Sequence, residues 1–477
     1  MAYKALIEQV KKVSYLGSAC SVLGWDQEVC MPKGGVEPRS LELATISEIA
    51  HSMFTSKIIG SLIKKAKSER LNSEQESNVR LIERDYLRSV RIPSWLVVDF
   101  AKVTTKAVEA WRVARHKSDF SVFSPHLAKV IALSKKKAQF IDDKKPAYDV
   151  LLDGHDFGLT SKKVYGYFGE LKATLKSLVK KRAGPGMPVL SVSQQEVLCR
   201  FVAEKLGFDF THGRIDRSTH PFSTGNSKDA RITTRYSKDP FDSLLSTMHE
   251  SGHAMYEQGL LWRNFGTPLG EPCSLSIHES QSRIWENHVG KSKEFIKWVV
   301  PKMQKLGCKV IAKDAYDWVN CVSPGFIRVD ADEVTYHLHI ILRFEIEKAI
   351  FDDKLRVGEI PSAWNEKMKS YLGIRPPNDA KGCLQDIHWS SEFAYFPTYT
   401  IGTMIAAQLF ASAENSVEQL RRRISIGEFS ALKNWLNKNI HQFGRRYDTD
   451  ELVMKATGSR PDTSYLLKHL SAKYRNV

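Results

Sequence analysis

The sequence lacks the long apolar runs of membrane proteins. No stretch approaches the roughly 20 apolar residues that a transmembrane helix needs. The hydrophobic content of 42% and the charged content of 26% are those of a soluble globular chain. The N-terminal segment, MAYKALIEQVKKVSYLG, is charged and amphipathic, without the apolar stretch and cleavage site of a secretory signal. We therefore expect a cytoplasmic protein that does not associate with membranes.

Paired cysteines, internal repeats and low-complexity tracts are also missing. The seven cysteines are an odd number, and no C-x-x-C pair occurs among them. This pattern argues against a disulfide framework and against a metal site built from cysteines. No period of about 20 to 50 residues is visible, so a helical solenoid is disfavoured.

Acidic residues are too few to balance the basic ones, and the excess is unevenly distributed. Of the net charge of +16, residues 1–200 carry +12 and the remainder +4. Such an excess can serve an acidic partner or nucleic acid. Lysine pairs at helical spacing, as in SKKVYGYFGELKATLKSLVKKRAG, are more typical of a solvated helix face. We predict no nucleic-acid function.

Helical periodicity dominates the chain and predicts a mainly α-helical protein. Apolar residues recur at spacings of three and four in EQESNVRLIERDYLRSV, QQEVLCRFVAEKLGF and VTYHLHIILRFEIEKAIF. Alternation and β-branched residues predict short strands over 229–236 and 325–329, enough for a small sheet. We expect one domain over 1–477, with lobes that divide near 183–192, where RAGPGMPVLSVSQ carries glycine and proline.

One predicted helix, PFDSLLSTMHESGHAMYEQG, carries a metal-site pattern. His249 and His253 are four residues apart, so both lie on one face of the helix. At this spacing two imidazoles can reach one zinc ion, each at about 2.0 to 2.1 Å. Glu250 lies about 100° around the helix and is better placed as a general base acting on water.

A catalytic zinc ion usually takes three protein ligands, so a third is needed. The predicted helix LSIHESQSRIWENHVG offers two carboxylates, Glu279 and Glu286, which are two turns apart on nearly one face. Either could bind the metal while the other supports the site from outside. A solvated helix face is the alternative explanation for Glu286.

Several motifs together resemble those of the carboxypeptidase Taq family of zinc metallocarboxypeptidases, and the resemblance covers nearly the whole chain. The five ordered motifs are D-A-R-I-T at 229–233, H-E-S-G-H at 249–253, H-E-S-Q-S-R at 278–283, I-R-V-D-A-D at 327–332 and G-C-L-Q-D-I-H-W at 382–389. W-D-Q-E-V-C-M-P-K-G-G at 25–35 and H-P-F at 220–222 are also similar to the family's sequences.

The tripeptide H-E-S occurs twice in these motifs, at 249–251 and 278–280. The resemblance implies roles for the residues of both copies. His249, His253 and Glu279 correspond to the metal ligands, and Glu250 corresponds to the catalytic base. We expect His278 to be a bystander. The resemblance further implies a large helical zincin fold with a deep groove, a homodimer, and zinc, or cobalt in its place. The implied activity is removal of single residues from the free C-terminus of peptides.

Substrate contacts follow from the chemistry of amide hydrolysis at a terminal carboxylate. Zinc-activated water attacks the carbonyl with Glu250 as base. Tyr395 and Tyr399 are the candidate donors to the oxyanion, and the resemblance points to Tyr399, although a tyrosine beside prolines also suits plain packing. A guanidinium binds a carboxylate best. Arg328 resembles the family's carboxylate binder. Arg231 is the other candidate for this role, or it simply pairs with Asp229. We expect His220 to be a weak substrate contact.

Two other functions stand against this reading. A helical zincin endo-oligopeptidase would use the same metal chemistry on internal peptide bonds. A non-enzymatic basic helical binding protein would carry H-E-S-G-H without a bound metal. The ordered motifs favour the exopeptidase over both.

Overall fold

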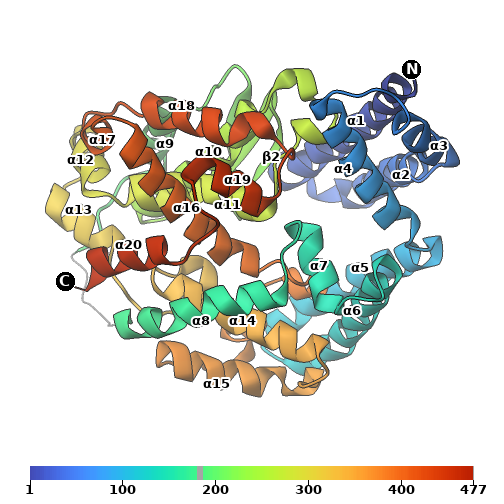
Figure 1. The fold of residues 1–477 in the computed structure, drawn as a ribbon. Coiled ribbons are helices and arrows are strands. Elements are labelled where there is room, and N and C mark those ends of the chain that lie inside the picture. Colours follow the sequence, from blue (N-terminus) through green and yellow to red (C-terminus); the bar gives the residue numbers. More distant parts are fainter. Residues whose placement is uncertain (180–185, 476–477) are drawn as a thin grey trace. The chain divides into compact units, whose positions relative to one another are not determined.

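A computed structural model describes residues 1–179 and 186–475 (Figure 1). It is mainly α-helical with one small sheet, as the sequence predicts. The chain divides into two compact units. Unit 1 comprises Met1–Leu87, Pro185–Val319 and Ile405–Pro461, and unit 2 comprises Arg88–Gly184, Asn320–Met404 and Asp462–Val477. Part of the expected lobe boundary, 183–185, lies outside the described residues, and the prediction of a single domain remains a prediction.

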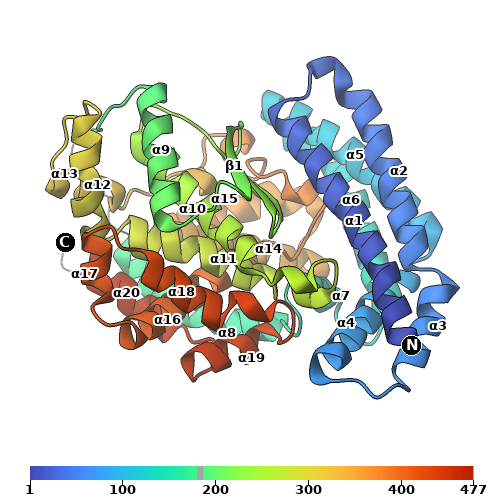
Figure 2. The same ribbon diagram turned by 90° about the horizontal axis from the view of Figure 1, so that it is seen from above.

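Unit 1 contains the N-terminal helices and most of the C-terminal ones. Its helices are α1 (Ala2–Val29), α2 (Val36–Phe54), α3 (Lys57–Ala66), α9 (Val192–Leu206), α10 (Pro240–Gly259), α11 (Leu275–Arg283), α12 (Lys293–Lys305), α13 (Ala312–Val319), α17 (Leu420–Ser425), α18 (Ser430–Asn439) and α19 (Thr449–Thr457). The helices α1 and α2 lie side by side (Figure 2).

Unit 2 is built around one deeply buried helix. Its helices are α5 (Ser94–Lys117), α6 (Phe120–Ile141), α7 (Ala147–His155), α8 (Ser161–Leu178), α14 (Thr335–Phe351), α15 (Ile360–Leu372) and α20 (Ser464–Tyr474). Two further helices, α4 (Ser73–Val90) and α16 (Pro397–Ser416), contain residues of both units. Nearly all side chains of α14 are buried. The helix lies beside α8 and α15 (Figure 1). The helix is buried although it carries polar side chains such as His339, Arg343 and Glu347, which have hydrogen-bond partners there.

The sheet lies in unit 1 beside the helix with the metal-site pattern. Its strands are β1 (Gly213–Arg217), β2 (Ser223–Asn226) and β3 (Asp229–Thr234), in the order β1-β3-β2. β3 pairs in parallel with β1 and antiparallel with β2, and it packs against α10. The predicted strand over 229–236 is therefore confirmed in its greater part. Its partner strands were not predicted, because they are short and rich in glycine, serine and charge.

The predicted strand over 325–329 is wrong. Among the described residues, this segment pairs with no strand, and Arg328–Asp330 forms a turn of 3₁₀ helix. The backbone N–H of Arg328 donates to the Gln385 side chain at 2.8 Å instead of to a neighbouring strand. Alternating β-branched residues favour extended backbone, but they form a strand only where a partner strand is available.

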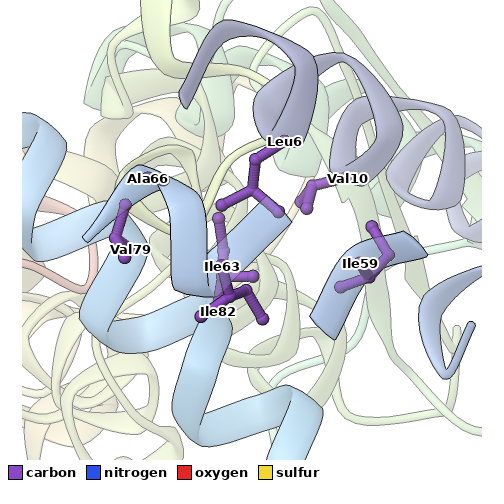
Figure 3. Packing of buried hydrophobic residues seen from close by; sticks show 7 residues of the cluster. All are labelled: Leu6, Val10, Ile59, Ile63, Ala66, Val79 and Ile82. Carbon is purple, nitrogen blue, oxygen red and sulfur yellow. The ribbon is translucent and has the colours of Figure 1, made fainter. Parts of the chain in front are cut away.

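An apolar cluster joins the N-terminal helices of unit 1. The members come from α1, α3 and α4: Leu6, Val10, Ile59, Ile63, Ala66, Val79 and Ile82. Figure 3 shows their side chains gathered between the three helices. Ser56 caps α3 by accepting the N–H of Ile59 at 3.5 Å, which fixes where this helix enters the cluster.

Among the helices of the described residues, none has both the length and the apolar character that a membrane span needs.

Truncation of this cluster should destabilise the protein. The Leu6 side chain is 0% exposed, so we expect Leu6→Ala to lower the free energy of unfolding by about 2 to 5 kcal/mol, through lost burial and a residual cavity. Leu41→Ala is the matched control, because Leu41 is 66% exposed, and it should change stability by less than about 0.5 kcal/mol. Urea unfolding measures both, and equal effects would contradict the assigned core.

Candidate functional site

The helix α10 begins where the sequence predicts. Asp239 caps it by accepting the N–H of Phe241 at 2.9 Å, and Pro240 occupies the first turn. The indole of Trp318 donates to the other Asp239 carboxylate oxygen at 2.8 Å. This anchored start fixes the rotation of α10, and therefore the direction in which its two histidines point.

Three donor atoms converge beside α10. A nitrogen of His249, a nitrogen of His253 and a carboxylate oxygen of Glu279 all lie within 4.8 Å of one another. The Nε2 atoms of the two histidines lie 3.7 and 3.5 Å from Glu279 Oε2. Two imidazoles and one carboxylate are the donor set of many catalytic zinc sites, so these residues fit a metal ion.

The opposite ring nitrogens point away from the cluster and have partners of their own. His249 Nδ1 lies 2.8 Å from Glu286 Oε2, and His253 Nδ1 lies 2.6 Å from His278 Nδ1. In histidines that bind metals, the second ring nitrogen almost always donates its hydrogen to a partner, often a carboxylate, and this contact fixes the orientation of the ring. The structure thus separates the two carboxylates of the second helix, because Glu279 faces the Nε2 atoms and Glu286 faces an Nδ1 atom.

Glu279 is held in place by its own helix. Arg283, one turn later, donates from Nε to Glu279 Oε1 at 2.6 Å, and the Ser282 hydroxyl lies 3.3 Å from Oε2. Burial alone would raise the pKa of Glu279, but Arg283 and His249 outweigh it and hold that pKa well below the ordinary value. Glu279 is therefore an anion that is ready to bind a cation.

Glu286 occupies a turn of π-helix that directly follows α11. The π-helix covers Ile284–Gly290 and replaces the continuous α-helix expected from the sequence. Arg283 Nη1 and Lys291 Nζ lie 2.9 and 3.1 Å from the Glu286 carboxylate. Glu286 is thus a half-buried side chain with three charged or imidazole partners, and it is not part of a solvated helix face.

Glu250 lies next to the donor cluster and is almost completely buried. Burial raises its pKa to about 7, with Glu279 adding to the increase and His249 opposing it. A carboxylate with a pKa near neutrality can both accept and release a proton at pH 7.

The cluster depends on the close approach of α10 and α11, which lie side by side (Figure 1). A Cβ atom at Gly252 would lie 2.6 Å from the Gln281 carbonyl oxygen and 2.7 Å from the Ser282 Cα. Both atoms belong to the backbone and cannot move aside cheaply. Glycine is therefore required at this position of the H-E-S-G-H motif for Glu279 to reach the two histidines.

A second charged cluster lies in unit 2 around Asp386. Arg328 donates from Nε and Nη2 to Asp386 Oδ1 at 3.1 and 2.7 Å, and Arg343 donates from Nε to Oδ2 at 2.7 Å. Both arginines are buried. Burial alone would raise the pKa of Asp386, but the two guanidinium groups hold it well below its ordinary value.

This cluster carries an excess of positive charge. Among the described residues, the two guanidinium groups form ion pairs with one carboxylate, that of Asp386. Burial lowers the pKa of His388 to about 4 and that of His339 to about 3, so both imidazoles are neutral at pH 7. One positive charge therefore remains, and a buried charge needs a partner. The ring of Tyr399 lies 5.2 Å from the Arg328 guanidinium.

The remaining sequence-derived site residues belong to unit 1 and differ from Arg328 in their surroundings. Arg231 donates from Nε and Nη2 to the two oxygens of Asp229, both at 2.8 Å, and lies over the Trp25 ring at 4.5 Å. One carboxylate balances its charge, and this pairing with Asp229 is the alternative role that the sequence analysis gives for Arg231. His220 is exposed, and its carbonyl accepts the Ser218 hydroxyl at 2.6 Å.

Several residues of these clusters were not found from the sequence. Arg343 and Asp386 meet only in the fold, and nothing local to either residue predicts their pairing. Arg283 could have been found, because it stands four residues after Glu279, at the spacing of helical ion pairs. Glu257 likewise stands four residues after His253.

The helical fold and the histidine and carboxylate donor set define the chain as a metallopeptidase. A family model described as "Carboxypeptidase Taq (M32) metallopeptidase" matches residues 5–474. The chain therefore belongs to the carboxypeptidase Taq (M32) family. It is an enzyme, a carboxypeptidase that acts on peptides, and the family implies a metal cofactor.

Relatives match over almost their full length. Thermostable carboxypeptidase 1 of Thermus thermophilus is 38% identical, over 99% of this chain and 98% of the relative. The protein of the same name from Pyrococcus furiosus is 37% identical with the same coverage. Among solved structures, the M32 carboxypeptidase of Deinococcus radiodurans superposes with a TM-score of 0.96 at 35% identity, covering 99% of this chain and 98% of that one.

Gly252→Ala should disturb the donor cluster. We expect a loss of about 1 to 3 kcal/mol in unfolding free energy from overpacking, with weaker metal uptake because α11 must shift. Gly166→Ala in α8 is the control, since a Cβ there meets nothing within 4 Å and should stabilise the helix by up to about 1 kcal/mol. Urea unfolding and elemental analysis of both variants check this. Unchanged metal content with unchanged stability in Gly252→Ala would contradict the required close approach.

Proposed function

We propose that this chain is a zinc-dependent metallocarboxypeptidase that removes single amino acids from the free C-terminus of peptides. The observation that carries the proposal is the convergence of His249 Nε2, His253 Nε2 and Glu279 Oε2 on one point. The membership in the carboxypeptidase Taq (M32) family supports the exopeptidase reaction.

His249, His253 and Glu279 are the proposed ligands of the zinc ion. Three protein donors leave one position open, as catalytic zinc sites require. When bound, the ion supplies a Lewis acid that acidifies water and polarises a carbonyl group. Cobalt suits the same mixed nitrogen and oxygen donors and is the proposed substitute.

Glu250 is the proposed general base. Its carboxylate accepts a proton from the attacking water and then releases this proton to the amine that leaves when the peptide bond breaks. The pKa of about 7 supports this double role, because neither transfer is then strongly uphill at neutral pH. Burial also keeps bulk water from competing for the carboxylate.

Arg328 is the proposed binder of the substrate's terminal carboxylate. Asp386 engages the Nε and Nη2 edge of the guanidinium. Nη1 donates to the Tyr336 hydroxyl at 3.3 Å, so a second carboxylate on the edge formed by Nη1 and Nη2 would share it with that hydroxyl. The excess positive charge around Asp386 supports this assignment, because an anion would neutralise it. Arg231 lacks such an excess, since Asp229 alone balances it, and is at most a secondary contact together with His220.

Tyr399 is the proposed donor to the oxyanion of the tetrahedral intermediate. Its hydroxyl lies 3.4 Å from His388 Nε2, and its ring packs 5.2 Å from that of Tyr395. These contacts orient the ring from two sides, which supports Tyr399 as a preorganised donor. The proposed setting is a cytoplasmic homodimer, which rests on the resemblance of the sequence motifs to the family and on the sequence analysis.

Metal removal and loss of Glu250 should abolish activity in different ways. A chelator should stop the release of single residues from a peptide with a free C-terminus. Glu250→Gln should lower kcat by about 10²- to 10⁴-fold while zinc content stays at one ion per chain, because the base is lost but the ligands remain. Product ladders by mass spectrometry and elemental analysis measure the two effects, and the C-terminally amidated peptide is the substrate control.

Other outcomes would favour the alternative functions. Internal cleavage of the amidated peptide would indicate a zincin endo-oligopeptidase. A chain without bound metal, whose function is unaffected by Glu250→Gln, would indicate a non-enzymatic binding protein.

The two arginine candidates can be separated by matched substitutions. Arg328→Lys should lower kcat/KM by about 10- to 100-fold, because a charge-assisted hydrogen bond worth about 1.5 to 3 kcal/mol is lost. Arg231→Lys should change it by less than about threefold. Steady-state kinetics on a short peptide measure both variants, and the reverse order of effects would assign the carboxylate to Arg231.

A further inference from the structure

His278, the residue before Glu279, lies in contact with the metal-site histidine of the neighbouring helix. Its Nδ1 atom is 2.6 Å from His253 Nδ1, and the two ring centroids are 4.6 Å apart. Its other nitrogen, Nε2, lies 3.0 Å from Glu257 Oε1. Three side chains thus form a row from Glu257 through His278 to His253. This arrangement differs from the bystander role that the sequence suggests for His278.

The hydrogen-bonding capacities of these groups determine where each proton lies. His253 can bind a metal through Nε2 only if that atom carries a lone pair, so Nδ1 carries the hydrogen and must donate it. The acceptor at 2.6 Å is His278 Nδ1, which therefore holds a lone pair. His278 then carries its hydrogen on Nε2 and donates it to the Glu257 carboxylate. With His253 bound to a metal through Nε2, this arrangement of protons satisfies every contact in the row.

The helix geometry explains why an imidazole stands between His253 and a carboxylate. His253 and Glu257 lie one turn apart on the same face of α10. The close approach of α11 at Gly252 brings His278 against both of them. On the other ligand, the corresponding nitrogen of His249 reaches Glu286 directly at 2.8 Å. The two histidines are therefore oriented by unlike partners.

We infer that His278, backed by Glu257, is a positioning residue that fixes the tautomer and ring orientation of His253, so that Nε2 faces the metal. The inference rests on the proposed function, because it takes His253 as a metal ligand. It gives the two H-E-S copies complementary parts. The glutamate of the second copy binds the metal, and the histidine of that copy orients a ligand of the first. Partners of this kind typically change metal affinity by 10- to 100-fold when they are removed.

Two substitutions of similar size and polarity separate this role from simple packing. In His278→Asn, the amide oxygen takes the place of Nδ1 and still accepts the His253 N–H. In His278→Gln, the amide group extends to the place of Nε2, toward Glu257, and leaves the His253 N–H without its acceptor. We expect zinc affinity within about threefold of wild type for His278→Asn and about 10- to 100-fold weaker for His278→Gln.

The measurement is the zinc dissociation constant of the metal-free protein, obtained by competition with a chromophoric chelator. Circular dichroism and thermal unfolding verify that each variant is folded. His337→Gln is the matched control, because His337 is a buried imidazole of unit 2, bonded to Thr400 Oγ1 at 3.1 Å. It should leave zinc affinity unchanged even if it lowers stability.

Each result supports or overturns the inference. Equal zinc affinity in wild type and His278→Gln would overturn it alone and leave the proposed function intact. Equal losses in His278→Asn and His278→Gln, or in His337→Gln, would also overturn it, because the effect would then follow from lost packing. A wild-type chain that binds no zinc would overturn the inference and the proposed function together.

Discussion

The contact between Gly252 and the backbone of α11 is the constraint on which the rest of the site depends. It sets the spacing of two helices that carry every group of the donor cluster. With this spacing, Glu279 reaches the Nε2 atoms and His278 reaches His253 from the outer side. The anchored start of α10 at Asp239 sets the remaining variable, the rotation of that helix. The metal centre therefore depends on this steric contact, on the cap of α10 and on the partners that hold its donor side chains.

Both the donor cluster and the cluster around Asp386 have an imbalance of charge among their side chains. Around the donor atoms, carboxylates outnumber cationic side chains, so a bound cation would reduce the imbalance of charge. The carboxylates are those of Glu250, Glu257, Glu279 and Glu286, and the cations are those of Arg283 and Lys291. Around Asp386, two guanidinium groups face one carboxylate, so a monovalent anion would do the same. The donor cluster thus suits a cation, and the cluster around Asp386 suits an anion.

The features that could be predicted from the sequence are those set by near neighbours in the chain. Capping residues and helical period located the start of α10 and the shared face of its histidine pair. Features set by distant contacts could not be predicted. The π-helix over 284–290 departs from an ordinary helical pattern, and the segment 325–329 finds no partner strand in the described part of the chain. Arg343 meets Asp386 only in the folded chain. The role of His278 depends on the approach of another helix.

Each unit is assembled from three separate stretches of the chain. Neither can therefore be cut out, duplicated or exchanged as a contiguous gene segment. The stretch from 185 to 319 brings the donor cluster, and the next stretch, from 320 to 404, brings Arg328, Arg343 and Asp386. A recombination event that transferred one stretch alone would carry over only part of its unit. Because the stretches of the two units alternate along the chain, the two clusters are inherited together.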